Sequence, residues 1–127
     1  MNDCLCKPAE IMLFACSGAA NVGQISNDAS FELHKEGKAR MFCLAGLGGH
    51  VQGIIDATKQ AKKIIVVDGC SVACAKKIVE LADFSIDDYI VVTDEGIEKV
   101  AGKTDFSKEE VQKIKKRIEK NLCTPSA

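Results

Sequence analysis

The stretch Ile64-Ile65-Val66-Val67-Asp68-Gly69-Cys70-Ser71-Val72-Ala73-Cys74 decides the fold class. It opens with four branched aliphatic residues, as in a strand of a parallel sheet that is covered on both faces. Turn-forming residues follow, and apolar residues then recur at helical spacing from Val72 to Ala82. Ser71 is the expected N-cap of this helix. The stretch therefore predicts a strand, a tight turn and a helix.

The same alternation extends in both directions along the chain. Three more apolar runs are predicted strands: Ile11 to Ala15, Ala39 to Leu44 and Tyr89 to Val92. Residues 22–33 and 51–58 have the apolar period of helices. A last helix is predicted from a capping box at Ser107 and Glu110, and its apolar stripe continues to residue 122.

Strands that alternate with helices favour right-handed crossovers and a mostly parallel sheet. We therefore expect an α/β protein with a small three-layer Rossmann-like or flavodoxin-like fold and four strands in the order 2-1-3-4. The length of 127 residues suits one domain. We expect this domain to span residues 10–122, with flexible tails at 1–9 and 123–127.

Composition narrows the possible functions. The formal net charge is -1 and the lysines are dispersed, so no basic field is available to attract nucleic acid. No run of ~20 apolar residues could span a membrane. Leu13 to Cys16 faintly resembles a lipoprotein cleavage box, but the preceding region is neither basic enough nor apolar enough for a signal segment. We expect a cytoplasmic protein that binds neither nucleic acid nor membranes.

Seven cysteines need an explanation in such a chain. Disulfides are rare in the cytosol, so metal ligation or thiol chemistry is the better expectation. Cys4 and Cys6 lie on the expected N-terminal tail and are interpreted as unpaired or as a weak auxiliary pair. Cys123 is interpreted as a tail residue.

Four of the cysteines lie where the topology brings the chain together. Cys16 follows the first predicted strand, Cys43 lies near the end of the second, and Cys70 comes after the third. Cys74 falls in the first turn of the next helix. Because sites form at the carboxyl ends of parallel strands, these residues predict one four-thiolate metal centre. Zinc accepts four thiolates in a closed tetrahedral site.

Four polar residues near these cysteines are further candidates for the site. Asp68 is expected to accept N-H groups of the next turn and to stiffen the Cys70 loop, or to be a simple turn residue. Asn21 could orient a sulfur or help the loop bind a small anion or small molecule. His50 could replace a ligand or carry a proton, and Asp94 could line the pocket or cap a turn.

The cysteine motifs resemble those of the DGC-domain family. The similarity includes Cys16-Ser17-Gly18-Ala19-Ala20, Met41-Phe42-Cys43-Leu44-Ala45-Gly46-Leu47-Gly48-Gly49, Asp68-Gly69-Cys70 with Cys74, Val92-Thr93-Asp94 and Gly96-Ile97-Glu98-Lys99. The resemblance implies zinc binding, with Cys16, Cys43, Cys70 and Cys74 as ligands, and supplies no biochemical activity. Ser71 stands where many relatives are expected to have proline, and His50 stands where a basic residue is usual.

The sequence therefore favours a zinc-binding protein with a structural or carrier role. Three alternatives remain open at this level. Cys70 and Cys74 could form a thiol-disulfide redox pair near a helix N-terminus. A loosely held fourth ligand would leave the open zinc position of a metalloenzyme. Four thiolates would also suit an iron-sulfur cluster.

Overall fold

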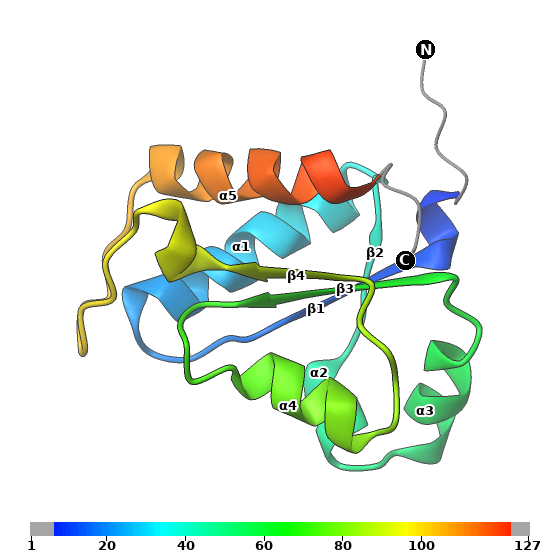
Figure 1. The fold of residues 1–127 in the computed structure, drawn as a ribbon. Coiled ribbons are helices and arrows are strands. Elements are labelled where there is room, and N and C mark those ends of the chain that lie inside the picture. Colours follow the sequence, from blue (N-terminus) through cyan, green and yellow to red (C-terminus); the bar gives the residue numbers. More distant parts are fainter. Residues whose placement is uncertain (1–6, 123–127) are drawn as a thin grey trace.

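A computed structural model describes residues 7–122. Its single sheet contains β1 (Ile11–Ala15), β2 (Arg40–Met41), β3 (Lys63–Asp68) and β4 (Asp88–Val91). All pairs are parallel and the strand order is β2-β1-β3-β4 (Figure 1). The expected α/β class and the strand order 2-1-3-4 are therefore confirmed.

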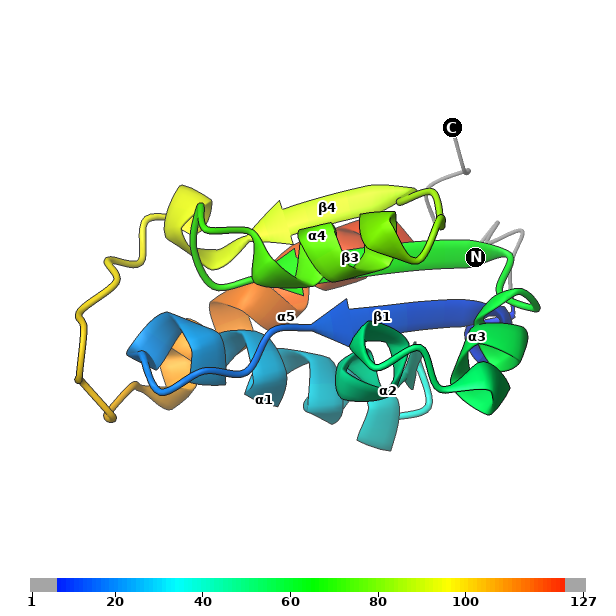
Figure 2. The same ribbon diagram turned by 90° about the horizontal axis from the view of Figure 1, so that it is seen from below.

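The register aligns the carboxyl ends of the three longer strands. Ala15 at the end of β1 pairs with Val67, and Asp68 at the end of β3 pairs with Val91 of β4. The arrowheads of β1, β3 and β4 accordingly point toward the same edge of the sheet (Figure 2). The loop after each strand therefore starts in one region of the molecule, as expected for an open parallel sheet.

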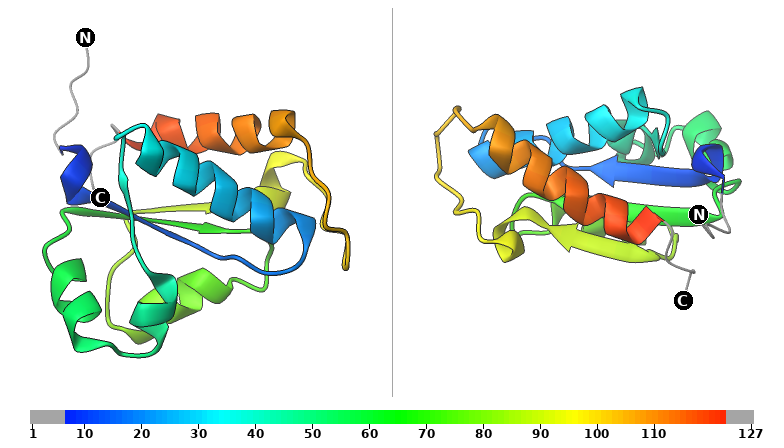
Figure 3. Two further views of the ribbon diagram at one scale, coloured as in Figure 1. Left: turned by 180° about the vertical axis from the view of Figure 1, so that it is seen from behind. Right: turned by 90° about the horizontal axis from the view of Figure 1, so that it is seen from above.

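Helices cover both faces of the sheet. On one face lie α1 (Asn21–Lys35) and α5 (Lys108–Leu122), which pack side by side (Figure 3). On the other lie α2 (Leu44–Gly48), α3 (Gln52–Thr58) and α4 (Cys74–Leu81), and the chain also contains the short 3-10 helices η1 (Pro8–Glu10) and η2 (Val92–Glu95). Between residues 7 and 122, no helix combines the length and apolar character needed to cross a bilayer.

The alternation of side chains along β1 divides the core into two layers. Leu13 and Ala15 face the α1 and α5 layer, while Met12 and Phe14 face the layer of α2 and α4. All four are at most 6% exposed. Burial on both faces explains why the strands are continuously apolar and do not alternate with polar residues.

Helix ends follow the expected signals in two places. Glu110 Oε1 accepts the Ser107 backbone N-H at 2.9 Å, and Ser107 Oγ accepts the Glu110 N-H at 3.1 Å. This is the reciprocal capping box predicted at the start of α5. At the end of α1, Gly37 has a φ of 72° and Lys38 N donates to Leu33 O at 3.0 Å. This positive φ is the reason that glycine terminates the helix.

The expected second strand, residues 39–44, is wrong in its extent. Regular pairing ends at Met41, and Cys43 becomes the N-cap of α2. The Cys43 sulfur accepts the Gly46 N-H at 3.3 Å, which replaces ladder bonding by a local turn. A Cβ atom at Gly46 would lie 2.7 Å from Ile54 Cγ1. Glycine at this position therefore lets α2 pack closely against α3.

A buried lysine joins the sheet to the end of α5. The Lys63 side chain lies at the start of β3, and the residue is 1% exposed. Its Nζ donates to the Asn121 carbonyl, one of the last carbonyls of α5, and forms an ion pair with Asp88 at 3.3 Å. Burial of the charge requires these partners, since an isolated buried ammonium group is strongly disfavoured.

We predict that Lys63→Met lowers the free energy of unfolding by about 3 kcal/mol, because Asp88 and the end of α5 lose a desolvated partner. The neighbouring Lys62→Met is the matched control, since Lys62 is exposed and pairs with Glu10 at 3.1 Å across solvent. Urea unfolding followed by circular dichroism measures both. A Lys63→Met protein as stable as the Lys62→Met protein would contradict this account of the buried pair.

Candidate functional site

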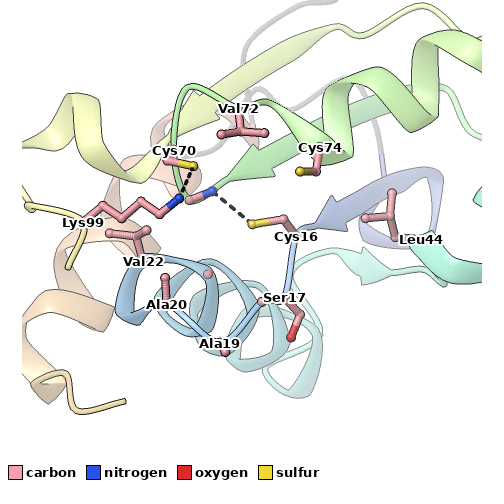
Figure 4. Close-up of a pocket in the computed structure, with 13 residues that line it drawn as sticks. Cys16, Ser17, Ala19, Ala20, Val22, Leu44, Cys70, Val72, Cys74 and Lys99 are labelled. Atoms are coloured by element: carbon pink, nitrogen blue, oxygen red, sulfur yellow. Dashed lines mark hydrogen bonds between the residues drawn. The ribbon is translucent and has the colours of Figure 1, made fainter. Parts of the chain in front are cut away.

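A pocket of about 430 Å³ opens at the carboxyl edge of the sheet. We call it the strand-end pocket (Figure 4). The loop after β1, the first turn of α1, the loop after β3 and the start of α4 contribute to it, together with single residues from α2 and from the segment after η2. Its lining residues are Cys16, Ser17, Gly18, Ala19, Ala20, Val22, Gly23, Leu44, Gly69, Cys70, Val72, Cys74 and Lys99.

Three of the four predicted ligands line this pocket. Cys16 follows β1 and Cys70 follows β3, and both are half-buried; Cys74 is exposed and is the first residue of α4. Cys43 is also exposed and lies one residue before the lining residue Leu44. The topology thus brings Cys16, Cys70 and Cys74 to one pocket, with Cys43 beside its boundary. None of these four cysteines is in a disulfide.

Hydrogen-bond donors face three of the sulfur atoms. Gly69 N donates to Cys16 Sγ at 3.1 Å, and Lys99 Nζ donates to Cys70 Sγ at 3.4 Å (Figure 4). The Cys43 sulfur has its donor within α2, as described above. Thiolate groups gain most from such donors, because a hydrogen bond to an ionised acceptor is stronger than one to a neutral acceptor.

The donor to Cys16 depends on close backbone packing. A Cβ atom at Gly69 would lie 2.8 Å from Val22 C and 2.9 Å from Val22 O. A Cβ atom at Gly23 would lie 2.8 Å from Gly18 N. A side chain at position 69 would therefore separate the loop after β3 from the first turn of α1, and one at position 23 would displace the loop after β1. Glycine at position 69 allows its own N-H to reach the sulfur of Cys16.

The environment of Cys16 favours the neutral thiol. Burial raises the pKa of this thiol, while hydrogen bonding from the Gly69 N-H, and then from the Ser26 side chain, opposes the shift. The nearby Asp68 carboxylate raises the pKa further, to a smaller extent. A bound cation would supply the charge that this environment lacks, because metal binding deprotonates a coordinating thiol.

The cysteine side chains do not converge on one point as they stand. Among residues 7–122, no group of three or more histidine, cysteine, aspartate or glutamate side chains is arranged to hold a metal ion. The donor set is nevertheless chemically suited to a thiophilic ion, since it offers thiols and N-H groups that stabilise thiolates. Coordination by all four sulfurs would require cysteine side-chain rotation, most readily at the exposed Cys43 and Cys74.

Asp68 lies at the end of β3 and accepts backbone N-H groups of the helix that follows. The residue is 1% exposed, and its carboxylate accepts the N-H groups of Ala75 at 2.8 Å and Lys76 at 3.0 Å. These are donors of the first turn of α4. The expected N-cap, Ser71, is therefore wrong: Ala73 occupies the N-cap position with a φ of 60°, and Asp68 satisfies the helix donors from a distance in sequence.

The phenol of Tyr89 completes the environment of this carboxylate. Tyr89 lies on β4, and its hydroxyl donates to Asp68 Oδ2 at 2.8 Å. Burial, and then the Asp68 carboxylate, hold the pKa of Tyr89 well above its ordinary range. This partner was missed at the sequence level because alternation along β4 does not reveal which polar group its tyrosine meets.

The other three candidate residues, Asn21, His50 and Asp94, do not line the strand-end pocket. Asn21 is 2% exposed, but it bonds the backbone on either side of Lys99 and not a sulfur. His50 is exposed in the turn between α2 and α3 with a φ of 54°, and is not among the lining residues of the strand-end pocket. Asp94 is exposed within η2 and is likewise not a lining residue.

Lys99 lines the pocket, although the sequence identifies it only as the last residue of the Gly96-Ile97-Glu98-Lys99 motif and does not assign it to the site. It lies 29 positions from Cys70 in an irregular segment, so no periodic pattern connects the two. Its neighbours Glu98 and Val100 are held by Asn21. Three cysteines of the N-terminal and C-terminal tails, Cys4, Cys6 and Cys123, lie outside the described residues.

Comparisons with known proteins identify the family of the chain. The chain belongs to the DGC domain family, whose sequence profile matches residues 12–118. The chain is also similar to the "Anaerobic and virulence modulator AnvM" of Pseudomonas aeruginosa strain PAO1. The two are 28% identical over 114 residues, which cover 90% of this chain and 86% of the relative. No solved structure matches the chain at a significant level.

The sole tyrosine provides a direct test of the Asp68 environment, because the chain has one tyrosine and no tryptophan. We predict that the phenol stays protonated in the folded protein at about pH 11, one unit above its ordinary pKa. Asp68→Asn should lower the Tyr89 pKa, because the variant removes the negative charge beside the phenol. Ultraviolet absorbance of the phenolate during a pH titration measures both proteins.

The matched control is Asp94→Asn, because Asp94 makes only the smallest contribution to the Tyr89 pKa shift. A raised folded-state pKa means that the folded protein holds this proton more tightly than the unfolded chain. Its contribution to stability is therefore full below about pH 10 and is lost as the pH rises toward the folded-state pKa. An ordinary pKa in the folded parent, or equal shifts in the two variants, would contradict the assignment.

Proposed function

We propose that this protein binds one zinc ion through Cys16, Cys43, Cys70 and Cys74 at the carboxyl edge of its sheet. The observation that carries the proposal is the common pocket of Cys16, Cys70 and Cys74, because it brings Cys16 to the Cys70 and Cys74 turn from more than 50 positions away in sequence. Cys43 adjoins that pocket through Leu44. Four thiolates around one ion form the closed site typical of structural zinc.

Charge balance supports this donor set. Four thiolates and one Zn²⁺ carry a formal charge of about -2, which needs N-H donors when water is excluded. The chain supplies such donors to Cys16, Cys43 and Cys70. Asp68 would support the site indirectly. It fixes the start of α4 and therefore the backbone of the ligand Cys74.

The proposed ion would connect two helices of one layer, α2 and α4, to the edge of the sheet. Cys16 and Cys70 extend from the central strands β1 and β3, whereas Cys43 and Cys74 begin α2 and α4. Ligation would therefore fix both helices to the edge of the sheet. The free energy of metal binding would add to the free energy of folding, because the unfolded chain lacks a preformed site.

Zinc in a closed site would have a structural or regulatory role in this proposal. The name of the Pseudomonas relative describes a modulator. We propose a comparable modulating role for this chain. Metal occupancy would set the shape of the surface formed by α2 and α4, and a partner protein would recognise that surface.

A thiol-disulfide function of Cys70 and Cys74 is the second candidate. It is favoured by their common pocket and by a tight turn between them, in which Ala73 N donates to Cys70 O at 3.2 Å. Oxidation would join the two sulfurs, release two protons and deliver two electrons to an external disulfide. Cysteine at the start of a helix is a favourable position for such exchange.

We predict about one zinc per chain after anaerobic purification, in line with a single four-thiolate site. Cys43→Ser should lose most of this zinc and the zinc-dependent part of the melting temperature. In metal-free protein the same variant should be as stable as the parent, because serine is itself a good N-cap for α2. Elemental analysis and thermal unfolding with and without chelator measure these effects.

The control is Cys123→Ser, which lies outside the described residues and should keep both the zinc and the added stability. Full zinc content in Cys43→Ser would exclude Cys43 as a ligand. Parent protein that lacks metal, and in which a disulfide between Cys70 and Cys74 forms and is reduced reversibly, would replace the zinc proposal by the redox function.

A further inference from the structure

Lys99 reaches the strand-end pocket from a segment that is neither helix nor strand. Residues 97–100 follow η2 and cross near the start of α1. The lysine is exposed, yet its Nζ lies 3.4 Å from Cys70 Sγ (Figure 4). An exposed lysine loses side-chain entropy when it is held in one contact. The contact with Cys70 is therefore favoured if the backbone of Lys99 is already fixed beside the pocket.

Asn21 fixes this backbone. Its Nδ2 donates to the Glu98 carbonyl at 2.9 Å, and its Oδ1 accepts the Val100 N-H at 3.0 Å. The amide therefore holds the residues on both sides of Lys99. Asn21 is the first residue of α1 and is 2% exposed, so the clamp is built on a rigid element.

The clamp explains the presence of a buried asparagine at this position. Both the donor and the acceptor of the amide are satisfied by residues 77 and 79 positions away. An aspartate could accept from Val100 but could not donate to Glu98, and an aliphatic residue could do neither. The side chain is thus specific for holding one segment of backbone, and Lys99 is the pocket residue on that segment.

The charge of Lys99 suits a thiolate centre. A zinc ion with four thiolates has a formal charge of about -2, and a cation in contact with one sulfur reduces the local excess of negative charge. Backbone N-H groups donate to Cys16 and Cys43, but they carry no net charge. Lys99 is the cationic residue among those that line the pocket.

We propose that Lys99 is the charge-compensating donor of the metal centre and that Asn21 positions it against the Cys70 sulfur. The inference rests on the proposed zinc site and adds two residues to its function. Lys99 would stabilise the metal-bound state, because a sulfur that coordinates the ion is a thiolate, and a thiolate gains more from a charged donor than a neutral acceptor does. Asn21 acts here as a positioning residue, and Lys99 donates to a ligand without being a ligand itself.

The first experiment compares zinc affinity in Lys99→Met, Lys99→Arg and the control Lys103→Met, by competition with a chromophoric chelator. Lys103 is an exposed lysine that follows the same segment and does not line the pocket. Loss of a hydrogen-bonding partner next to a ligand typically weakens metal binding by about 10- to 100-fold, and we expect this loss in Lys99→Met. Lys99→Arg should retain most of the affinity, and Lys103→Met all of it.

A spectroscopic measurement separates this role from general destabilisation. Cobalt(II) can replace zinc in tetrathiolate sites and has sulfur-to-metal charge-transfer absorption. Removal of a donor from Cys70 should move this band to lower energy in Lys99→Met and in Asn21→Ala, because the sulfur electrons are then less stabilised. Unchanged bands together with unchanged zinc affinity in Lys99→Met would overturn the inference.

Contact between Lys99 and Cys70 is tested without metal. Ortho-phthalaldehyde joins a neighbouring amine and thiol into a fluorescent isoindole, with loss of two water molecules. Metal-free parent protein should give an adduct between these two residues in peptide mapping, and Asn21→Ala should give less. If the parent binds no zinc, the proposed function fails whatever the adduct. If zinc binds but no adduct forms and the affinity is unchanged in Lys99→Met, only the Lys99 inference fails.

Discussion

The close packing of Gly69 against the first turn of α1 is the constraint on which the site depends. A Cβ atom there would lie within 3 Å of the Val22 backbone, so only glycine allows the loop after β3 to approach the helix that follows β1. The approach directs the Gly69 N-H to Cys16 and brings Cys70 to the same pocket. Asp68, one residue earlier, fixes the start of α4. The three residues Asp68, Gly69 and Cys70 thus position the ends of β1 and β3 and the start of α4.

Much of the fold could be predicted because it follows from local patterns. Apolar runs such as Ile11–Ala15 are buried on both faces, and the crossover rules limit their order. The error at residues 39–44 has a local cause as well: Met41, Phe42 and Cys43 resemble a strand in composition, yet the Cys43 sulfur bonds to Gly46 and begins α2. Side-chain capping and glycine packing overrode the apolar pattern.

The candidate site could be predicted only where topology determines it. Cysteines at strand ends come together because parallel strands share an edge, and this brought Cys16 and Cys70 to one pocket. Asn21 bonds the residues on both sides of Lys99 across 77 and 79 positions of sequence, and the Tyr89 hydroxyl meets Asp68 across 21 positions. Such pairings depend on the path of irregular segments, which periodicity does not describe. The profile of the DGC domain family covers residues 12–118, a range that includes Cys16, Cys43, Cys70 and Cys74.

The most direct test of the account is X-ray absorption spectroscopy at the zinc edge on anaerobically purified, metal-loaded protein. The account predicts four sulfur neighbours at about 2.3 Å and no nitrogen or oxygen ligand. Replacement of Cys74 by serine, at the exposed start of α4, should reduce the sulfur count to three. A first shell dominated by nitrogen or oxygen in the parent protein, or an unchanged sulfur count in Cys74→Ser, would contradict the proposed four-thiolate centre.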